Sequence, residues 1–297
     1  MSVSEWVQKG WREHAEQTEA VFERLHEGVA LVDGADDAGK VAGLIVHVAG
    51  EHLGRWDAGL ALLDRILERQ EAGSVWRSKA ILHHCAGRID ERDAASARGR
   101  SEFSESSDQI RILALSASAL IGQGGVDAAG EALSTALDLA GYGPDSEDPA
   151  ARALAVAGNG IAATLEEREG RSAAEDDLLR TAAHAARRFW EIAGTWVNVE
   201  RAEYRLAKTY VALGDGVRAS AHAYACLAIC ADHDADAIEL FFGREALAHA
   251  LHVYGDPERA EEARDDAAAS LQAIEGGMRD WCAGELAKLD ATLADSR

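Results

Sequence analysis

Apolar residues recur at spacings of three and four along the whole chain, and no stretch alternates apolar and polar residues as a half-buried strand would. Short breaks rich in Gly, Asp and Pro interrupt this pattern about every 15–20 residues. Between the breaks lie about a dozen segments of helix length. Two of them start on an acid followed by proline, at Asp148 and Asp256, which is a helix-start signal. The pattern predicts an all-α protein.

Glycines at the breaks reveal a repeat. We align five of them as anchors: Gly54, Gly124, Gly170, Gly214 and Gly255. The last three intervals are 46, 44 and 41 residues long. Five positions after four of these anchors a small residue returns: Gly59, Ala129, Ala219 and Ala260. Twelve positions after each anchor stand Ile66, Ala136, Ala182, Cys226 and Ala267. This is the pattern of antiparallel helix pairs, because helix axes approach closely only where side chains are small. A single pair cannot bury its own apolar face, so the pairs are expected to stack.

The chain resembles the tetratricopeptide repeat (TPR) family. Segments 206–227 and 247–267 match best, and 47–67 fits with Trp56 at the usual aromatic position. The resemblance covers about residues 40–290, with repeats longer than the family's usual length. It implies a right-handed α-α superhelix, a TPR-like solenoid of about five to six helical hairpins.

The expected organisation has three parts. A helix at about 3–30, within residues 1–35, packs on the array. Residues 36–275 form the TPR-like repeat array, and 276–297 form a C-terminal capping helix in which Trp281 seals the open end of the core. Uncapped solenoid ends favour association, so the chain is expected to be a monomer or a homodimer.

Composition narrows the function. Lys and Arg total 30 against 52 Asp and Glu, which gives an acidic protein of net charge −22. This balance disfavours nucleic acid and anionic membrane surfaces, since both require a dense cationic surface. Alanine, with 61 residues, suits close helix crossings. No signal peptide or spanning segment is evident, and four cysteines form no disulfide framework, so the expected location is cytoplasmic.

One cationic cluster stands out against the acidic background. Arg201, Arg205 and Lys208 lie at i, i+4 and i+7 on one helix face, together with Tyr204. Arginine offers a two-pronged donor set to a carboxylate. The family resemblance adds that Arg201 and Arg205 fall where peptide-binding TPR domains hold a C-terminal carboxylate, with Asn159 and Arg111 as rough substitutes for the rest of that clamp. The alternative is a solvated face balanced by acids such as Glu200 and Glu203.

Histidines and cysteines are the remaining candidates for chemistry. His249 and His252 stand three apart on a helix that, by the resemblance, lines the concave groove. His222, Cys226, Cys230 and His233 form one helical stripe, but a straight helix spreads them over about 16 Å, too far for one metal ion. Packing is the favoured interpretation of this stripe. No motif of an enzyme, metal site or phosphate loop is found, so we expect no catalysis, no metal and no cofactor.

The sequence therefore predicts a non-enzymatic protein–protein interaction module. Its concave groove would bind a peptide or partner protein with a free carboxylate or basic character. The candidate binding residues are Arg201, Tyr204, Arg205, Lys208, His249 and His252. A regulatory sensor array that binds a small acidic ligand or signalling peptide is the alternative, and a His/Cys metal protein or enzyme is a third class.

Overall fold

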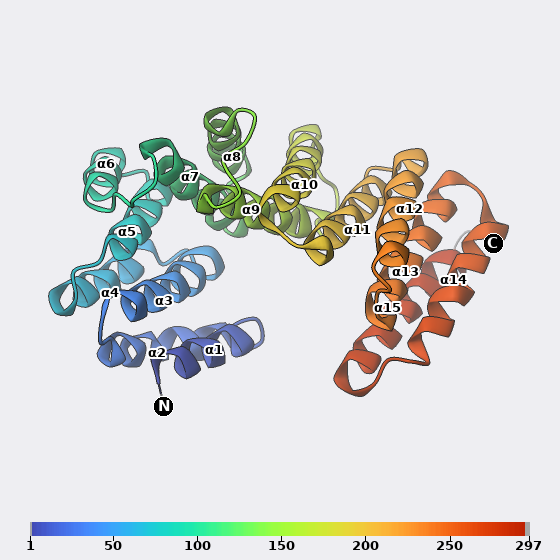
Figure 1. Cartoon of the computed structure of the whole chain (residues 1–297), viewed down its shortest axis with the longest axis horizontal. Coiled ribbons are helices and arrows are strands. Elements are labelled where there is room, and N and C mark those ends of the chain that lie inside the picture. Colours follow the sequence, from blue (N-terminus) through green and yellow to red (C-terminus); the bar gives the residue numbers. More distant parts are fainter. Residues whose placement is uncertain (1, 295–297) are drawn as a thin grey trace. The chain divides into compact units, whose positions relative to one another are not determined.

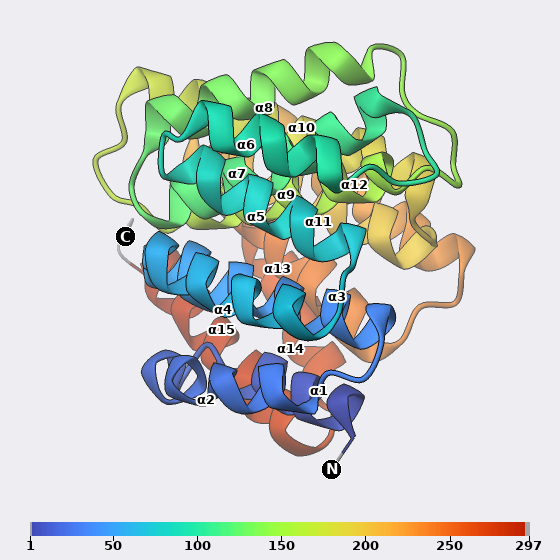
Figure 2. The ribbon, with the colours of Figure 1, turned by 90° about the vertical axis from the view of Figure 1, so that its left-hand side faces the viewer.

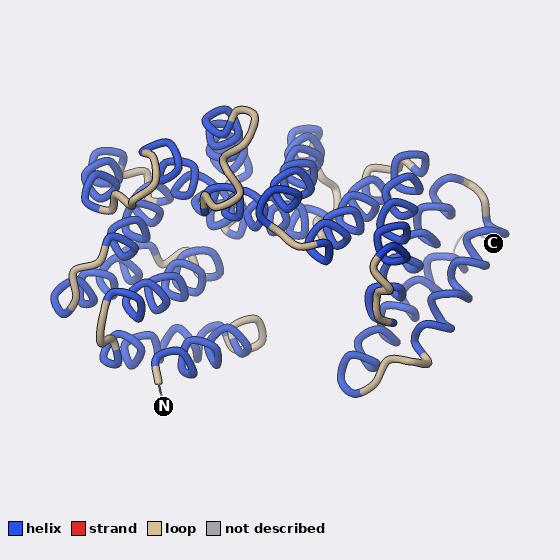
Figure 3. The backbone as a smooth tube through the Cα atoms, viewed as in Figure 1, coloured by secondary structure: helices blue, strands red, loops and turns tan. Residues whose placement is uncertain are grey.

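A computed structural model describes residues 2–294 of the chain; Met1 and the last three residues of the predicted capping segment lie outside this range. Fifteen α-helices and one π-helix, joined by short loops, make up the described residues, and none of these residues forms a strand (Figure 3). The predicted all-α fold is confirmed. Within this part of the chain, no helix combines the length and the apolar character required to cross a membrane.

The chain divides into two compact units, Met1–Ala157 and Gly158–Arg297, called unit 1 and unit 2 below. Unit 1 holds α1 (Val3–Glu13), α2 (Thr18–Leu31), α3 (Ala35–Ile45), the π-helix η1 (Val46–His52), α4 (Trp56–Arg69), α5 (Gly73–Cys85), α6 (Ile89–Arg98), α7 (Glu105–Gly122) and α8 (Val126–Ala140). Its hairpins follow one another: α1 packs against α3, α2 against α4, α3 against α5, and α5 against α7 (Figures 1 and 2).

Unit 2 begins inside α9 (Pro149–Glu166). It continues with α10 (Ala173–Ala193), α11 (Trp196–Ala212), α12 (Gly216–Asp232), α13 (Ala237–Tyr254), α14 (Pro257–Leu271) and α15 (Gly276–Ala294). Helices α11 and α12 form one hairpin, and α13 and α14 form the next. The last helix, α15, lies against α13 and α14 (Figure 1).

The repeat predicted from the anchor glycines is found in the hairpins. All five anchor glycines adopt positive φ angles between 61° and 89°, a conformation that ends a helix at no steric cost only for glycine. The small residues five positions later are buried, and so are those twelve positions later (Gly59, Ala129, Ala219, Ala260, Ile66, Ala136, Ala182, Cys226, Ala267). The predicted stack of helical hairpins is therefore confirmed by the glycine turns and by the small residues at the helix crossings.

Predicted helix starts are also found. The Asp256 side chain accepts a hydrogen bond from the backbone N–H of Arg259, and Pro257 occupies the first turn of α14. Likewise, Asp148 accepts a hydrogen bond from the backbone N–H of Ala150 at the start of α9, at 2.9 Å. Both acids thus satisfy backbone donors that a helix leaves unpaired at its N-terminus.

The N-terminal segment differs from the prediction. The single helix expected at about 3–30 is two helices, α1 and α2, separated by a turn at residues 14–17. Residues 13–17, Glu-His-Ala-Glu-Gln, include no large apolar side chain that would hold a continuing helix against the core. Two shorter helices instead bury Trp6 and Leu25 on the same side, against α3 and α4.

Candidate functional site

A cleft of about 820 Å³ lies within unit 2, among the last turns of α9 and the helices α11, α13 and α15. One part of its wall is charged and comes mainly from α9 and α11. The other is largely apolar and comes from α13 and α15, with Ile238, Phe242, Met278 and Trp281. The cleft arises because α15 packs on α13 and α14 and leaves this face of α11 uncovered.

The cationic cluster predicted from sequence lines the cleft. Arg201, Tyr204, Arg205 and Lys208 all belong to α11 and all contribute to the wall. Each cation meets a glutamate from a neighbouring helix. The Arg201 guanidinium pairs with Glu239 of α13, and the Arg205 guanidinium pairs with Glu166 at the end of α9. The cluster is therefore a row of ion pairs. In each pair, a glutamate far away in the sequence neutralises one cation of α11.

Lys208 ends this row in the best-buried pair. Its ammonium lies 2.6 Å from Glu245, whose side chain is only 2% exposed. The same carboxylate lies 2.9 Å from Nε2 of His249. Burial by itself raises the pKa of Glu245, but Lys208 and His249 outweigh it and bring this pKa down to about 2. Glu245 is therefore an ionised carboxylate that its contacts with Lys208 and His249 hold inside the unit.

Glu200 behaves in the opposite way. Its carboxyl is buried against two thiols, with Cys226 Sγ at 2.8 Å and Cys230 Sγ at 3.7 Å. Burial raises the pKa of Glu200 to about 7, and the nearby Glu239 adds to this rise. The two buried glutamates Glu200 and Glu245 thus differ in charge near neutral pH, because Glu245 contacts Lys208 whereas Glu200 contacts two thiols.

The apolar part of the wall is exposed. Trp281 is 53% exposed and Met278 is 38% exposed, although both are large. The Trp281 ring lies 4.8 Å from the ring of Phe242, and Phe242 in turn lies 5.7 Å from Tyr204. This line of aromatic rings joins the apolar wall to the row of ion pairs. Trp281 thus faces the cleft and only partly fulfils the sealing role expected of it.

The two candidate histidines lie elsewhere. Neither His249 nor His252 is part of the cleft wall, although His249 reaches the row of ion pairs through Glu245. Of the rough substitutes for a carboxylate clamp, Asn159 lines the cleft, whereas Arg111 belongs to unit 1 and lies 3.3 Å from Asp108. The structure thus brings four of the six candidate residues into one cleft.

The helical stripe on α12 is divided among different partners. His222 lies 2.7 Å from Glu203, the two thiols contact Glu200, and the ring of His233 stacks on Trp196. As their helical spacing indicated, the four side chains do not converge on one point. The structure adds what spacing could not show: a carboxyl group from α11 lies beside both cysteines.

The sequence did not point to the glutamates or to the apolar wall as parts of a site. Glu166, Glu239 and Glu245 were part of a general acid excess with no distinguishing motif. Their helical position offered a signal, since Glu239 and Glu245 lie in helix α13, which is otherwise rich in apolar residues. An acid inside an apolar helix usually requires a buried partner.

Comparison with known proteins finds a similarity in structure and none in sequence. No protein-family model matches the chain, and no curated protein matches it in sequence. Among solved structures the chain is similar to one described as the crystal structure of the P58(IPK) TPR domain, with 12% sequence identity, a TM-score of 0.28 and coverage of 99% of each chain. The helices, their glycine turns and their buried small residues show an all-α chain of helical hairpins.

Proposed function

We propose that this chain is a non-enzymatic interaction scaffold and that the cleft of unit 2 binds a segment of a partner protein. The observation that carries the proposal is the exposure of Trp281 and Met278 at the wall of a cleft of about 820 Å³. Only 6% of the chain is aromatic, so few aromatic side chains are available to cover apolar surface. Tryptophan is also prominent among the residues that dominate binding energy at protein interfaces.

The apolar wall supplies the anchor. Phe242, Met278 and Trp281 offer a surface against which an apolar side chain of the partner loses contact with water. Tyr204 extends this surface towards the ion pairs. A segment that lies along the cleft would therefore place an apolar residue on the α13–α15 side and polar groups on the α11 side.

The charges of the cleft favour a basic segment. Its wall carries five acids (Glu166, Glu167, Glu200, Glu239, Glu285) and four bases (Arg201, Arg205, Lys208, Lys288). Three of the bases already contact glutamates on adjacent helices. A carboxylate ligand would have to compete for them, whereas a Lys or Arg of the partner is attracted by a chain of net charge −22. We therefore favour a segment that combines an apolar anchor with basic residues.

A peptide-display selection on the whole chain tests the proposal. We expect the enriched peptides to combine an aromatic or aliphatic residue with Lys or Arg, and Trp281→Ala to weaken their binding by about 30-fold, the usual effect of losing an interface hot spot. Trp11→Ala is the matched control, because Trp11 is 42% exposed and lies in unit 1. Equal losses in both variants, or no loss in Trp281→Ala, would contradict binding in this cleft.

Recognition of a free C-terminal carboxylate would give a different binding result. Arg201 is 62% exposed despite its contact with Glu239, far more than Arg205 or Lys208, so it is the cation of the α11 cluster best placed to reach a carboxylate. If the partner's C-terminus is recognised, peptides with an amidated end bind more weakly than those with a free end, and Arg201→Ala removes the difference. If a basic segment is recognised, amidation has no effect.

One observation favours a sensor of small acidic ligands as the second candidate. Within the described part of the chain, Nε of Arg205 is buried without a hydrogen-bond partner. A buried donor of this kind is costly unless a ligand or water satisfies it. Calorimetry with small dicarboxylates would show binding that Arg205→Ala abolishes and that Trp281→Ala leaves unchanged. The expected cytoplasmic location and the monomeric or homodimeric state stay predictions.

A further inference from the structure

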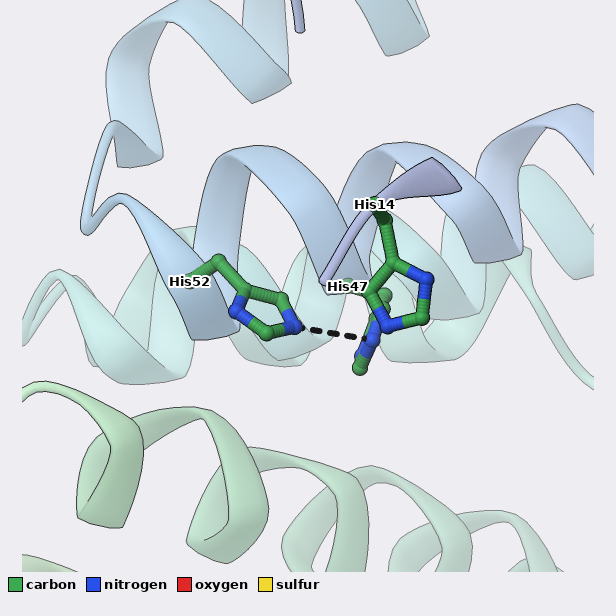
Figure 4. Close-up of side chains that lie close together, drawn as sticks. All are labelled: His14, His47 and His52. Atoms are coloured by element: carbon green, nitrogen blue, oxygen red, sulfur yellow. Dashed lines mark hydrogen bonds between the residues drawn. The ribbon is translucent and has the colours of Figure 1, made fainter. Parts of the chain in front are cut away.

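Three histidines of unit 1 converge at the end of the first hairpin. His14 caps the C-terminus of α1, while His47 and His52 belong to the π-helix η1. One ring nitrogen from each lies within 4.8 Å of the other two. Figure 4 shows the three rings turned towards one another, with the dashed line joining His47 and His52.

The π-helix creates this arrangement. Residues five apart on an α-helix point about 140° away from each other, so His47 and His52 would lie on different faces of one. Hydrogen bonds in a π-helix link residues five apart, which brings such residues onto the same face. The Nε2 atoms of His47 and His52 accordingly lie 3.1 Å apart. Single π-turns are rare and occur frequently at functional sites.

Contacts at the other ring nitrogens orient the imidazoles. Nδ1 of His47 lies 2.8 Å from a carboxylate oxygen of Glu51, and Nδ1 of His14 lies 2.7 Å from the backbone carbonyl oxygen of Trp11. With Nδ1 donating to these oxygens, Nε2 of both rings carries no proton and is an acceptor, and Nε2 of His47 accepts a hydrogen bond from Nε2 of His52. Metal-binding histidines show this arrangement, since they almost always donate their second ring nitrogen to a carboxylate or a carbonyl group.

The spacing suits a tetrahedral ion. Two nitrogen ligands at the usual Zn–N distance in a tetrahedral site lie about 3.3 Å apart. The 3.1 Å between His47 and His52 is close to this value, and His14, whose nitrogen lies within 4.8 Å of the other two, completes three corners after a shift of at most about 1.5 Å. The ligands are three imidazoles without a carboxylate among them, a set that suits Zn²⁺ and similar transition metals and not Mg²⁺ or Ca²⁺.

We propose that His14, His47 and His52 form a binding site for a divalent transition metal, with Zn²⁺ as the best-suited ion. Glu51 is a positioning residue that orients the His47 ring and offsets part of the ion's charge. His52 is solvent-exposed, so water or an external ligand occupies the fourth corner. Bound metal would fasten the end of α1 to η1 and so tie the first hairpin to the second.

Titration of the metal-stripped full chain with Zn²⁺ alone, by calorimetry, tests the site. We expect one ion per chain, and an affinity loss of more than about 100-fold in His14→Ala, His47→Ala or His52→Ala. Glu51→Gln should weaken binding by about 10- to 100-fold, because Glu51 orients the His47 ring without itself binding the ion. His26→Ala is the matched control: His26 is an exposed histidine of unit 1 whose Nδ1 contacts only the Glu23 carbonyl in the described structure.

A second group, Glu200 with Cys226 and Cys230, is the competing location. Co²⁺ distinguishes the two, since thiolate ligands add charge-transfer absorption that imidazole ligands do not. We expect a Co²⁺ spectrum without thiolate bands and unchanged binding in Cys226→Ser/Cys230→Ser. Any one of three results would overturn the proposal. These are thiolate bands, loss of binding in the cysteine variant, and wild-type affinity in a His52→Ala protein whose helical circular dichroism is unchanged. His52 serves best here, because its exposed side chain contributes little to folding.

Discussion

Units 1 and 2 use the same helical hairpin but fill it differently. Unit 1 buries large aliphatic side chains, including Leu25, Leu44 and Leu63, and Asp108 is the one buried acid among its described residues. The described part of unit 2 buries fewer large aliphatic side chains and, besides alanines such as both units bury, four glutamates: Glu200, Glu203, Glu239 and Glu245. Long charged side chains of one helix in unit 2 reach those of the next, as Arg201 reaches Glu239 and Lys208 reaches Glu245. The contrast teaches that one repeat can be held by packing or by buried ion pairs.

The largest expected effect concerns the ion pairs of unit 2. Glu245→Ala leaves Lys208 and His249 partly buried without their carboxylate. Breaking a buried pair on one side usually costs about 3–5 kcal/mol, because the remaining charge is uncompensated. Urea unfolding at neutral pH measures the loss. A change below about 1 kcal/mol would show that water reaches Lys208 and that unit 2 depends on packing as unit 1 does.

The matching experiment in unit 1 removes a large core side chain. Leu63 is fully buried, and Leu63→Ala should cost about 2–5 kcal/mol through lost burial and the cavity left behind. The same urea measurement applies. A loss well below this range would mean that unit 1 relaxes around the missing side chain and is less tightly packed than its list of buried aliphatic residues indicates.

The pH dependence of stability should also distinguish two buried glutamates of unit 2, Glu200 and Glu245. The pKa of Glu200 rises to about 7 on folding, so folding favours its protonated form. The contribution of Glu200 to the stability of the wild-type protein therefore falls as pH rises from about 4.5 to 7. Glu200→Gln removes this penalty, so its gain in stability over wild type should be greater at pH 8 than at pH 5, by about 1–3 kcal/mol. An equal gain at both pH values would show that Glu200 is ionised at pH 5.

Glu245 gives the opposite slope. Its pKa of about 2 lies below that of an unfolded glutamate, so its contribution is present above about pH 5 and is lost as pH falls towards 2. Glu245→Ala should accordingly flatten the acid limb of the stability profile, whereas Glu200→Gln should flatten the limb between pH 5 and 7. Thermal unfolding across this pH range separates the two effects.

The smallest expected effect is that of an exposed pair. Arg55 and Glu19 of unit 1 form a two-pronged contact at 2.8 Å with both side chains substantially exposed. Glu19→Ala should cost less than about 1 kcal/mol, because solvent screens exposed pairs. A loss comparable to that of Glu245→Ala would remove burial as the explanation for the difference between the units.

Local signals in the sequence were sufficient for most helices and turns, although not for the turn between α1 and α2. Gly214 and Gly255 end helices because only glycine tolerates their positive φ angles freely, and Asp256 starts one because its side chain bonds a free N–H group. Ala219 and Ala260 were recognised as crossing points from their constant distance to these turns. Each of these features depends on residues a few positions apart, which is why the repeat could be predicted.

The sequence by itself also placed Arg201, Arg205 and Lys208 on one face, since helical spacing decides that. Tertiary structure alone decided that Glu166, Glu239 and Glu245 would neutralise them, because the partners lie 37 to 39 residues away on other helices. It alone brought Trp281 to the cleft. The histidine cluster of unit 1 depends on both a π-turn and a contact between α1 and η1, neither of which α-helical periodicity encodes. Periodicity determines which residues share a face, whereas packing determines what that face meets.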